Sequence, residues 1–361
     1  MTITNLSREN PSSETTPVAT GTNAVAIGSG SVANGQHSFS IGQNTVSGTT
    51  GGNNYAVAIG YAATGTGAFS TSVGGFTDAT AQHALALGTY AQATGVRSSS
   101  IGRALASGAD SLASSLTSTS SSYGAQGASS VAIGKEAKAT GAGSIALSTK
   151  TYTGGAVATG SGSVAIGDGA AASGLLGMAI GRGATASGTM SMAYGRDSQA
   201  TQEESKAFGY RSYADVTGCF AYASGYFGAA NGDAQGRQYI LRKATTDATA
   251  TVLTTDAGNA TTNNQIRVPA NSVVVFDGVI TACQSGVAAY AGWRVEGMIT
   301  NDGGTTVIQN NTITAIKNES GWRCRLSAND STDSLVVTVT GEASHNIRWV
   351  ANIRTVETIY A

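Results

Sequence analysis

The sequence predicts an all-β protein: a parallel β-roll of 14-residue coils, followed by an antiparallel β-sandwich or jelly roll. Two observations predict this fold class. An apolar residue followed by glycine recurs every 14 residues from Ile27 to Gly209, with few interruptions. After Asn231 the repeat stops and longer segments of alternating apolar and polar residues begin, which is typical of half-buried antiparallel strands.

Each coil contains one apolar-glycine pair and two short extended segments. The segment SVAIG (Ser130 to Gly134, and again Ser163 to Gly167) alternates Val and Ile with Ala, as a strand with one buried face requires. Glycine follows because the chain turns sharply where a Cβ would clash. We expect the apolar residue of each pair to point inward and form the core of the coil. These core candidates are Ile27, Ile41, Ile59, Val73, Leu87, Ile101, Ile133, Ile166, Ile180, Tyr194 and Phe208.

The repeat is interrupted in three places. Four extra residues within Gly48 to Asn53 indicate a loop insertion between the pairs at Ile41 and Ile59. The repeat decays between Arg103 and Ser130 and is stretched between Ser148 and Ser163. Because the same register resumes after both segments, we expect looser coils in one continuous roll, with a flexible linker as the alternative.

We expect three domains. Residues 1–23 form an attachment peptide, residues 24–231 the β-roll shaft, and residues 232–361 the β-sandwich tip. In the tip, about eight to ten strands are expected, typical of a sandwich or jelly roll. Asn and Gly tolerate φ > 0, which predicts a hairpin turn at the first of two loop segments. The candidate tip loops are Asn301, Asp302, Gly303 and Gly304, and Asn310 with Asn311.

A coil of 14 residues with small inward positions buries little apolar area by itself. We therefore expect several copies of the chain to associate with closed rotational symmetry that covers a second apolar face. In fibres built from stacked coils this symmetry is usually threefold. From about Ala24 to Ala230 the SxAxG and AxAxG units resemble the head of trimeric autotransporter adhesins of the YadA type. The resemblance implies a left-handed parallel β-roll in a homotrimer.

Residues 232–361 are similar to a C-terminal module of phage tail-fibre proteins. The resemblance rests on GDAQ (Gly232 to Gln235), ATTDAT (Ala244 to Thr249), Val268-Pro269, WRVEG (Trp293 to Gly297), VTGEA (Val339 to Ala343) and IRWVA (Ile347 to Ala351). Together the two resemblances imply a structural fibre protein of a tailed bacteriophage, on its tail or neck. Two alternatives remain, a fragment of a bacterial autotransporter-like adhesin and a tailspike-type glycan hydrolase.

Composition excludes several other functions. Charged residues make up 11% of the chain and the formal net charge is −1, so no basic field exists for nucleic acid or an anionic membrane surface. No apolar stretch is long enough to span a membrane, and none follows a basic segment at the N-terminus as in an export signal. Cys219, Cys283 and Cys324 lack metal-ligand spacing, so we expect three reduced thiols.

We expect no catalytic, cofactor-binding or metal-binding residues, and hence no enzyme. A glycosidase needs two carboxylates across a cleft, whereas the few acids of the roll lie mostly one per coil at turns and are expected to be solvated. His37 and His83 occupy one position of the repeat that other coils fill with unrelated residues. His345 lies beside Ser344 with no acid at a spacing that would support catalysis.

The expected partners follow from this organisation. The chain associates with itself as a homotrimer, and the peptide 1–23 docks into another virion protein. The tip loops face outward and contact a host cell-surface receptor or glycan, with capping of the roll as the alternative role. We expect the protein to be made in the host cytoplasm and located in the virion.

Overall fold

The computed structural model describes residues 15–50, 55–115, 122–149, 154–228 and 230–360. These residues form strands, turns and irregular segments without a helix, so none of them contributes a helix that could cross a membrane. The chain divides into two compact units, Met1–Leu176 and Gly177–Ala361, which we describe separately. The predicted all-β class is confirmed.

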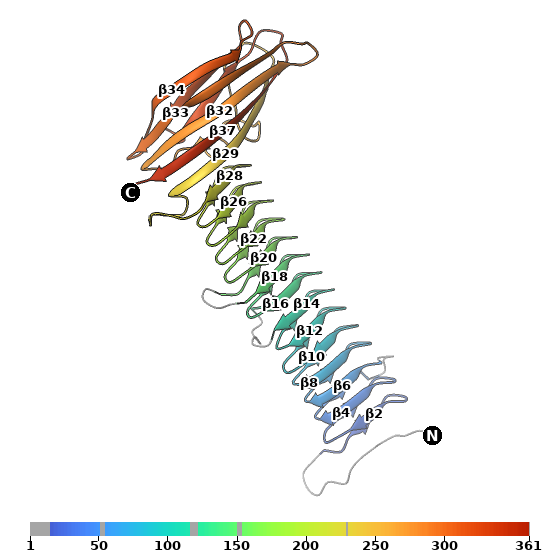
Figure 1. Ribbon diagram of the computed structural model, residues 1–361. Coiled ribbons are helices and arrows are strands. Elements are labelled where there is room, and N and C mark those ends of the chain that lie inside the picture. The colour runs from blue at the N-terminus through green and yellow to red at the C-terminus, as the bar shows by residue number, and fades with distance from the viewer. Residues whose placement is uncertain (1–14, 51–54, 116–121, 150–153, 229, 361) are drawn as a thin grey trace. The chain divides into compact units, whose positions relative to one another are not determined.

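The first unit consists of coils, each with one longer and one shorter strand (Figure 1). The longer strands pair in parallel in the long-strand sheet, and the two-residue strands do so in the short-strand sheet. The long-strand sheet holds β2 (Val25–Ile27), β4 (Phe39–Gln43), β6 (Val57–Tyr61), β8 (Thr71–Gly75), β10 (Leu85–Leu87), β12 (Ser99–Gly102), β14 (Leu112–Ser115), β16 (Val131–Gly134), β18 (Ile145–Ser148) and β20 (Val164–Ile166). The short-strand sheet holds β1 (Val18–Ala19), β3 (Val32–Ala33), β5 (Val46–Ser47), β7 (Thr64–Gly65), β9 (Asp78–Ala79), β11 (Gln92–Ala93), β13 (Leu105–Ala106), β15 (Gly124–Ala125), β17 (Lys138–Ala139), β19 (Val157–Ala158) and β21 (Ala171–Ala172).

The 14-residue period predicted the strand register. Ile27 lies beside Ile41 in the neighbouring coil, and Ile41 lies beside Ile59 in spite of the inserted residues between them. The register also continues through the loosened segment, where Ser114 pairs with Ile133. The coils therefore continue as expected, although residues 51–54, 116–121 and 150–153 of the three interrupted segments lie outside the described part of the chain. β1 already pairs with β3, so a coil strand lies within the predicted attachment peptide.

The interior of the coils is filled by alanine and serine, not by the core candidates. Ala165 is fully buried, while its neighbours Val164 and Ile166 are only partly buried. The same alternation recurs along the long-strand sheet, and all eleven core candidates are partly or largely exposed in the single chain. The structure thus reverses the expected orientation. Because successive side chains of a strand point to opposite faces, an interior wide enough only for Ala and Ser places the larger residues outside. The eleven outward residues are Ile27, Ile41, Ile59, Val73, Leu87, Ile101, Ile133, Ile166, Ile180, Tyr194 and Phe208.

Glycine is required where neighbouring coils come into backbone contact. Gly60 has a φ of +135°, and a Cβ built on it would lie 1.9 Å from the carbonyl oxygen of Gly74. A second glycine series meets the same limit: a Cβ on Gly141 would lie 2.1 Å from the carbonyl oxygen of Gly160. Both series therefore set how closely the coils stack.

The second unit begins with coils of the same kind and ends in two antiparallel sheets (Figure 1). Its coil strands are β22 (Met178–Ile180), β23 (Thr185–Ala186), β24 (Met192–Tyr194), β25 (Gln199–Ala200), β26 (Lys206–Gly209), β27 (Tyr213–Ala214) and β28 (Phe220–Ala223). The larger antiparallel sheet, called the C-terminal sheet, has the order β29 (Ala234–Thr245), β37 (Ile347–Ile359), β32 (Ser272–Gln284), β33 (Tyr290–Asp302) and β34 (Thr305–Lys317). The smaller sheet contains β30 (Thr251–Val252), β31 (Ile266–Arg267), β35 (Arg323–Asn329) and β36 (Ser334–Thr340).

The core of the second unit contains all three tryptophans. Trp293 stacks on Trp349 with ring centroids 5.8 Å apart, and Trp322 approaches Trp349 at the same distance. The indole N–H of Trp349 donates a 2.9 Å hydrogen bond to Oγ1 of Thr245. This polar partner lets a large aromatic residue remain fully buried.

The domain limits 23/24 and 231/232 stay predictions, since the compact units divide the chain inside the roll. The last coil strand, β28, pairs with the first strand of the C-terminal sheet, β29. This pairing is antiparallel, with Ala221 beside Arg237. The change from parallel coils to antiparallel strands thus occurs close to residue 232, where the repeat ends in the sequence.

We predict that Gly60→Ala lowers the free energy of unfolding by more than about 1 kcal/mol per chain, because both its backbone conformation and the next coil exclude a Cβ. Gly75→Ala is the matched control, since a Cβ there would meet only Cγ2 of Thr89 at 3.9 Å. Thermal unfolding followed by circular dichroism measures both. Equal melting temperatures for the two variants would contradict the role of glycine in coil stacking.

Candidate functional site

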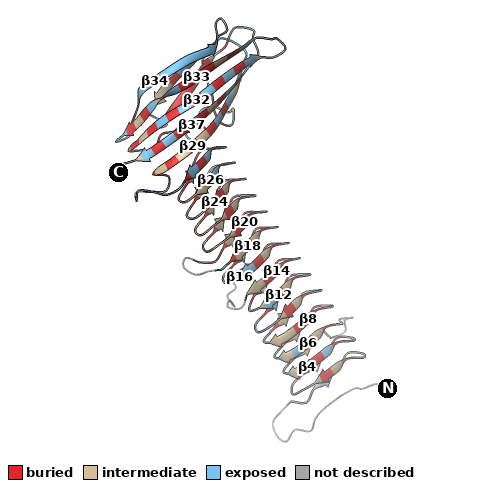
Figure 2. Cartoon of the chain, viewed as in Figure 1, coloured by how far each residue is buried: buried red, intermediate tan, exposed pale blue. Residues whose placement is uncertain are grey.

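The outer face of the long-strand sheet carries rows of large apolar side chains. In β16, Val131 and Ile133 point outward on either side of buried Ala132. Leu147 lies beside Ile133 in the next strand, and Ile166 lies beside Leu147. Ile133 is 41% exposed, although isoleucine is among the residues most often buried. Parallel pairing therefore aligns these residues in rows at the strand spacing. Figure 2 shows how burial alternates along the coil strands.

In the coils of the second unit, the outer face of the longer strands is aromatic. Tyr194 stacks on Phe208 at 5.7 Å, and Phe208 lies 5.5 Å from Phe220. Tyr194 is 52% exposed. By contrast, the outer face of the short-strand sheet is of mixed polarity and includes Asp78, Gln92 and Lys138. A contiguous apolar face of this kind marks an interaction surface.

A second feature is a stack of rings at one corner of the coils. His37, Tyr55, Phe69 and His83 follow one another with centroids 4.9, 5.1 and 5.0 Å apart and nearly parallel planes. All four have positive φ, which is strained for bulky residues. The stacking offsets part of that strain. The repeat position that holds the two histidines is therefore a structural corner. Sequence reasoning missed this role, although the steps of 14 residues from Tyr55 to Phe69 and from Phe69 to His83 signal it.

A buried charge cluster joins the last coil to the C-terminal sheet. The guanidinium of Arg237 is 1% exposed, and its Nη1 lies 2.7 Å from Oδ1 of Asp215. Its Nε lies 3.2 Å from Oε1 of Glu357 in an ion pair without hydrogen-bond geometry. Arg267 pairs with the other oxygen of Asp215 at 3.2 Å. Two carboxylates and two guanidinium groups thus balance in charge, as a buried cluster requires.

Polar neighbours complete the cluster. Nε2 of Gln235 and Oγ1 of Thr355 donate to Glu357 at 3.2 and 3.0 Å. Burial raises the pKa of Glu357, and the charge of Arg237 opposes that rise. The sequence prediction that the acids of the roll are solvated at turns does not hold for Asp215, which is 4% exposed. Its partners are too distant in sequence to be inferred from spacing.

The remaining acids and histidines of the roll do not form a common site. Arg97 and Asp110 form an exposed ion pair, in which hydrogen bonding by Arg97 lowers the pKa of Asp110. Asp168 is buried and accepts a 3.2 Å hydrogen bond from the backbone N–H of Gly154. In the second unit, Nδ1 of His345 lies 3.3 Å from Oε2 of Glu342. Within the described ranges, no group of three or more His, Cys, Asp or Glu residues is placed to hold a metal ion.

The three cysteines are free thiols. Burial raises the pKa of Cys219 and of Cys324 to about 11, so both are protonated at neutral pH. Cys283 is exposed on β32.

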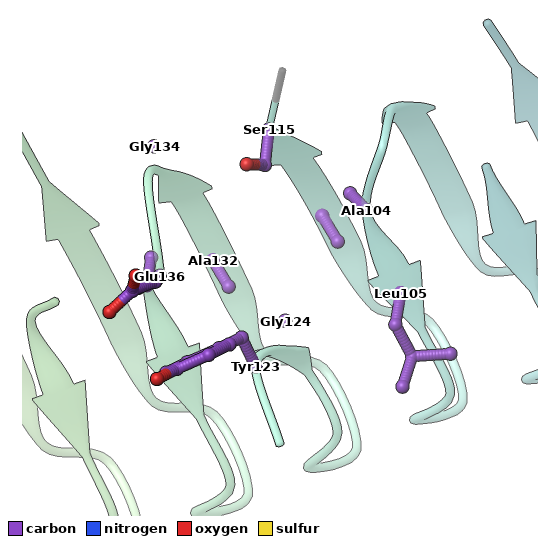
Figure 3. Close-up of a pocket in the computed structure, with 10 residues that line it drawn as sticks. Ala104, Leu105, Ser115, Tyr123, Gly124, Ala132, Gly134 and Glu136 are labelled. Carbon is purple, nitrogen blue, oxygen red and sulfur yellow. The ribbon is translucent and has the colours of Figure 1, made fainter. Parts of the chain in front are cut away.

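A small cavity lies between the coils near the loosened segment (Figure 3). Ala104, Leu105 and Tyr123 line it together with Gly134 and Glu136. Its volume is about 10 Å³, which is close to the minimum that admits a single water molecule. This cavity therefore has no room for a sugar substrate.

The candidate tip loops lie differently from the prediction. Asn301 is fully buried: its side-chain oxygen accepts a 3.1 Å hydrogen bond from Gly304 N–H, and its amide donates to Val268 O at 3.3 Å. Gly303 and Gly304 form the expected hairpin turn with positive φ, and Asp302 precedes them at the end of β33. Asn310 and Asn311 lie inside β34, beside Met298 and Gly297. A β-bulge between Met298 and Ile299 shifts the register there and conceals the strand from a period-two reading.

Comparison with known proteins identifies the repeat. The model of the YadA head domain repeat (2 copies) matches residues 19–45, 79–104, 125–147, 154–170, 158–184, 172–198 and 186–212. Parts of the coils thus match this repeat, as the sequence resemblance predicted. None of the curated proteins that were compared matches the chain. The resemblance of residues 232–361 to a phage tail-fibre module stays a prediction.

Among solved structures, the chain is similar to the tailspike protein gp49 of the Acinetobacter baumannii bacteriophage Fri1, a capsular polysaccharide depolymerase. The match has 11% sequence identity and a TM-score of 0.26, and it covers 95% of this chain and 67% of that chain. This finding corrects the expectation that the chain is not an enzyme, and we withdraw that expectation. At this TM-score the likeness transfers no catalytic residue to the chain.

We predict that Arg237→Met destabilises the protein by about 3–5 kcal/mol, because it leaves Glu357 with an uncompensated buried charge and leaves Asp215 with Arg267 as its one remaining counter-charge. The control Arg97→Met removes an exposed ion pair and should leave the melting temperature nearly unchanged. Thermal and urea unfolding of the two variants tests this. A loss as small for Arg237→Met as for Arg97→Met would show that the cluster does not hold the coil and the sheet together.

Proposed function

We propose that the chain forms a homotrimeric fibre protein of a bacteriophage particle and contributes to attachment of that particle to a host surface. The observation that carries the proposal is the apolar outer face of the long-strand sheet. Burial of one isoleucine or valine side chain contributes about 1.5–3 kcal/mol, and the rows repeat that gain in every coil. Association of copies along this face covers the rows, and closed rotational symmetry leaves none exposed.

The threefold order and the fibre role are supported by the YadA head domain repeat found in the coils. The location in the virion remains part of the proposal, as does docking of the predicted attachment peptide, residues 1–23, into another virion protein. Residues 1–14 of that peptide lie outside the described part of the chain.

The attachment role is assigned to the end of the second unit. The Gly303–Gly304 hairpin exposes Asp302 and both glycines. By contrast, Asn301 is buried, and Asn310 and Asn311 are paired residues inside β34. We propose that a host receptor or glycan is contacted through such exposed turns. Adsorption of particles that carry Asp302→Ala to host cells, compared with the parent, tests this assignment. Unchanged adsorption contradicts it.

We predict that the purified full chain sediments as a trimer at micromolar concentration. Sedimentation equilibrium gives the mass directly, against 35.9 kDa for one chain. A folded monomer at this concentration would contradict the proposed function, and a stable dimer would contradict the threefold order.

We predict that Ile133→Asp weakens the trimer by about 3 kcal/mol or more per chain, because it places a carboxylate in the covered apolar face. The matched control is Lys138→Asp, which introduces the same side chain on the outer face of the short-strand sheet in the same coil. Sedimentation velocity over a dilution series measures both. Equal trimer stability for the two variants would exclude the long-strand face as the interface.

A further inference from the structure

The outward face of the C-terminal sheet is also apolar, and it encloses a charged row. Six large apolar side chains on this face are between 38% and 68% exposed. This outward patch consists of Ile240, Val275, Val279, Met298, Val350 and Val356. They come from β29, β32, β33 and β37, whose alternate residues form the buried core on the opposite side.

The outward patch is continuous with the outer face of the coils in the second unit. β28 pairs with β29 so that Phe220 lies beside Gln238 and Tyr222 beside Gly236. These four residues are outward, while Ala221 and its partner Arg237 are both buried. One sheet surface therefore passes from the parallel coils into the antiparallel strands without turning over.

In the middle of the outward patch, a hollow of about 470 Å³ is lined by charged and amide side chains. Arg354 forms an ion pair with Asp277, and Gln238 donates a 3.0 Å hydrogen bond to Asn352. Glu296 lies directly across from Asp277 in the neighbouring strand, an arrangement of like charges that destabilises a sheet. The charges in the hollow are therefore not optimised for the single chain.

Two of these charges have no counterpart. Across the described ranges, neither Arg294 nor Glu296 has an ion-pair or hydrogen-bond partner, and both are exposed on β33. They are two residues apart on one face of the strand, and their side chains do not pair with each other. In a closed threefold assembly, one neighbouring copy can place its Glu296 against Arg294, and the other can place its Arg294 against Glu296.

We propose that the outward patch is an interface between copies of this chain, in which Arg294 of one copy pairs with Glu296 of another. The apolar rim is covered by the rims of the neighbouring copies, and the ion pairs between copies set the register of the sheets. This proposal rests on the self-association of the coils proposed above, but adds a separate contact surface. Continuity of the sheet face and complementary unpaired charges favour a second copy over an unrelated partner.

The proposal is tested on the full chain with Arg294→Glu, Glu296→Arg and the double exchange. The control is Arg325→Glu on β35 of the smaller sheet, an exposed arginine that likewise lacks a partner among the described residues. Each single reversal should lower the melting temperature of the assembled protein, and the double exchange should restore most of the loss. Single reversals that behave like the control, or a double exchange that is no better than the single variants, overturn the pairing.

A second readout measures coverage of the face directly. In a Cys283→Ser background, Val279→Cys places a thiol in the hollow, where the native side chain is 47% exposed in the single chain. We expect maleimide to label the introduced thiol at least tenfold more slowly in this variant than in the same variant that also carries Arg294→Glu. Equally fast labelling in both overturns the interface. If the parent protein sediments as an oligomer in that case, only this proposal fails, whereas a monomeric parent overturns the coil association as well.

Discussion

The close backbone contact between successive coils determines most of this structure. At Gly60 the next coil lies so near that a single additional carbon would overlap its carbonyl oxygen. The interior of each coil is also narrow and holds small residues such as Ala165 and Ser163. The larger apolar residues of the long strands then lie outside, so the narrow interior creates the apolar outer face. The association between copies that we propose would thus follow from how each chain packs internally.

The register and the orientation of the strands differ in how far they follow from sequence. The spacing of the apolar-glycine pairs predicted the register, because parallel coils of equal length place equivalent residues side by side, as Ile27 and Ile41 do. The orientation of the strands did not follow from sequence. Val-Ala-Ile alternates whether Ala or the larger residues point inward, and only the width of the coil interior decides which of them is buried. Ile166, expected inside, lies outside for this reason.

In the second unit, the local sequence pattern predicted strands, but it did not predict which distant residues contact each other. The alternation of apolar and polar residues after Asn231 predicted half-buried antiparallel strands. β37 is one of them, with Ile347, Trp349 and Ile353 on its buried face, because a long regular strand repeats its pattern many times. The cluster of Asp215 with Arg237 and Glu357 could not be predicted, since no spacing relates a coil residue to two residues of a distant sheet. Asn310 was likewise misplaced, because one bulged residue ends the alternation.

The buried cluster and the outward charges of the C-terminal sheet illustrate two uses of charge in one domain. Arg237 is enclosed by carboxylates of its own chain, so its contribution is complete in the single copy and holds coil and sheet together. Arg294 and Glu296 lie on the opposite side of the same sheet, with no partner among the described residues and next to apolar residues that a single chain leaves in water. An isolated protein gains nothing from that combination. It becomes favourable when neighbouring copies remove the apolar rim from water and supply the two missing counter-charges, which is why we assign this face to assembly.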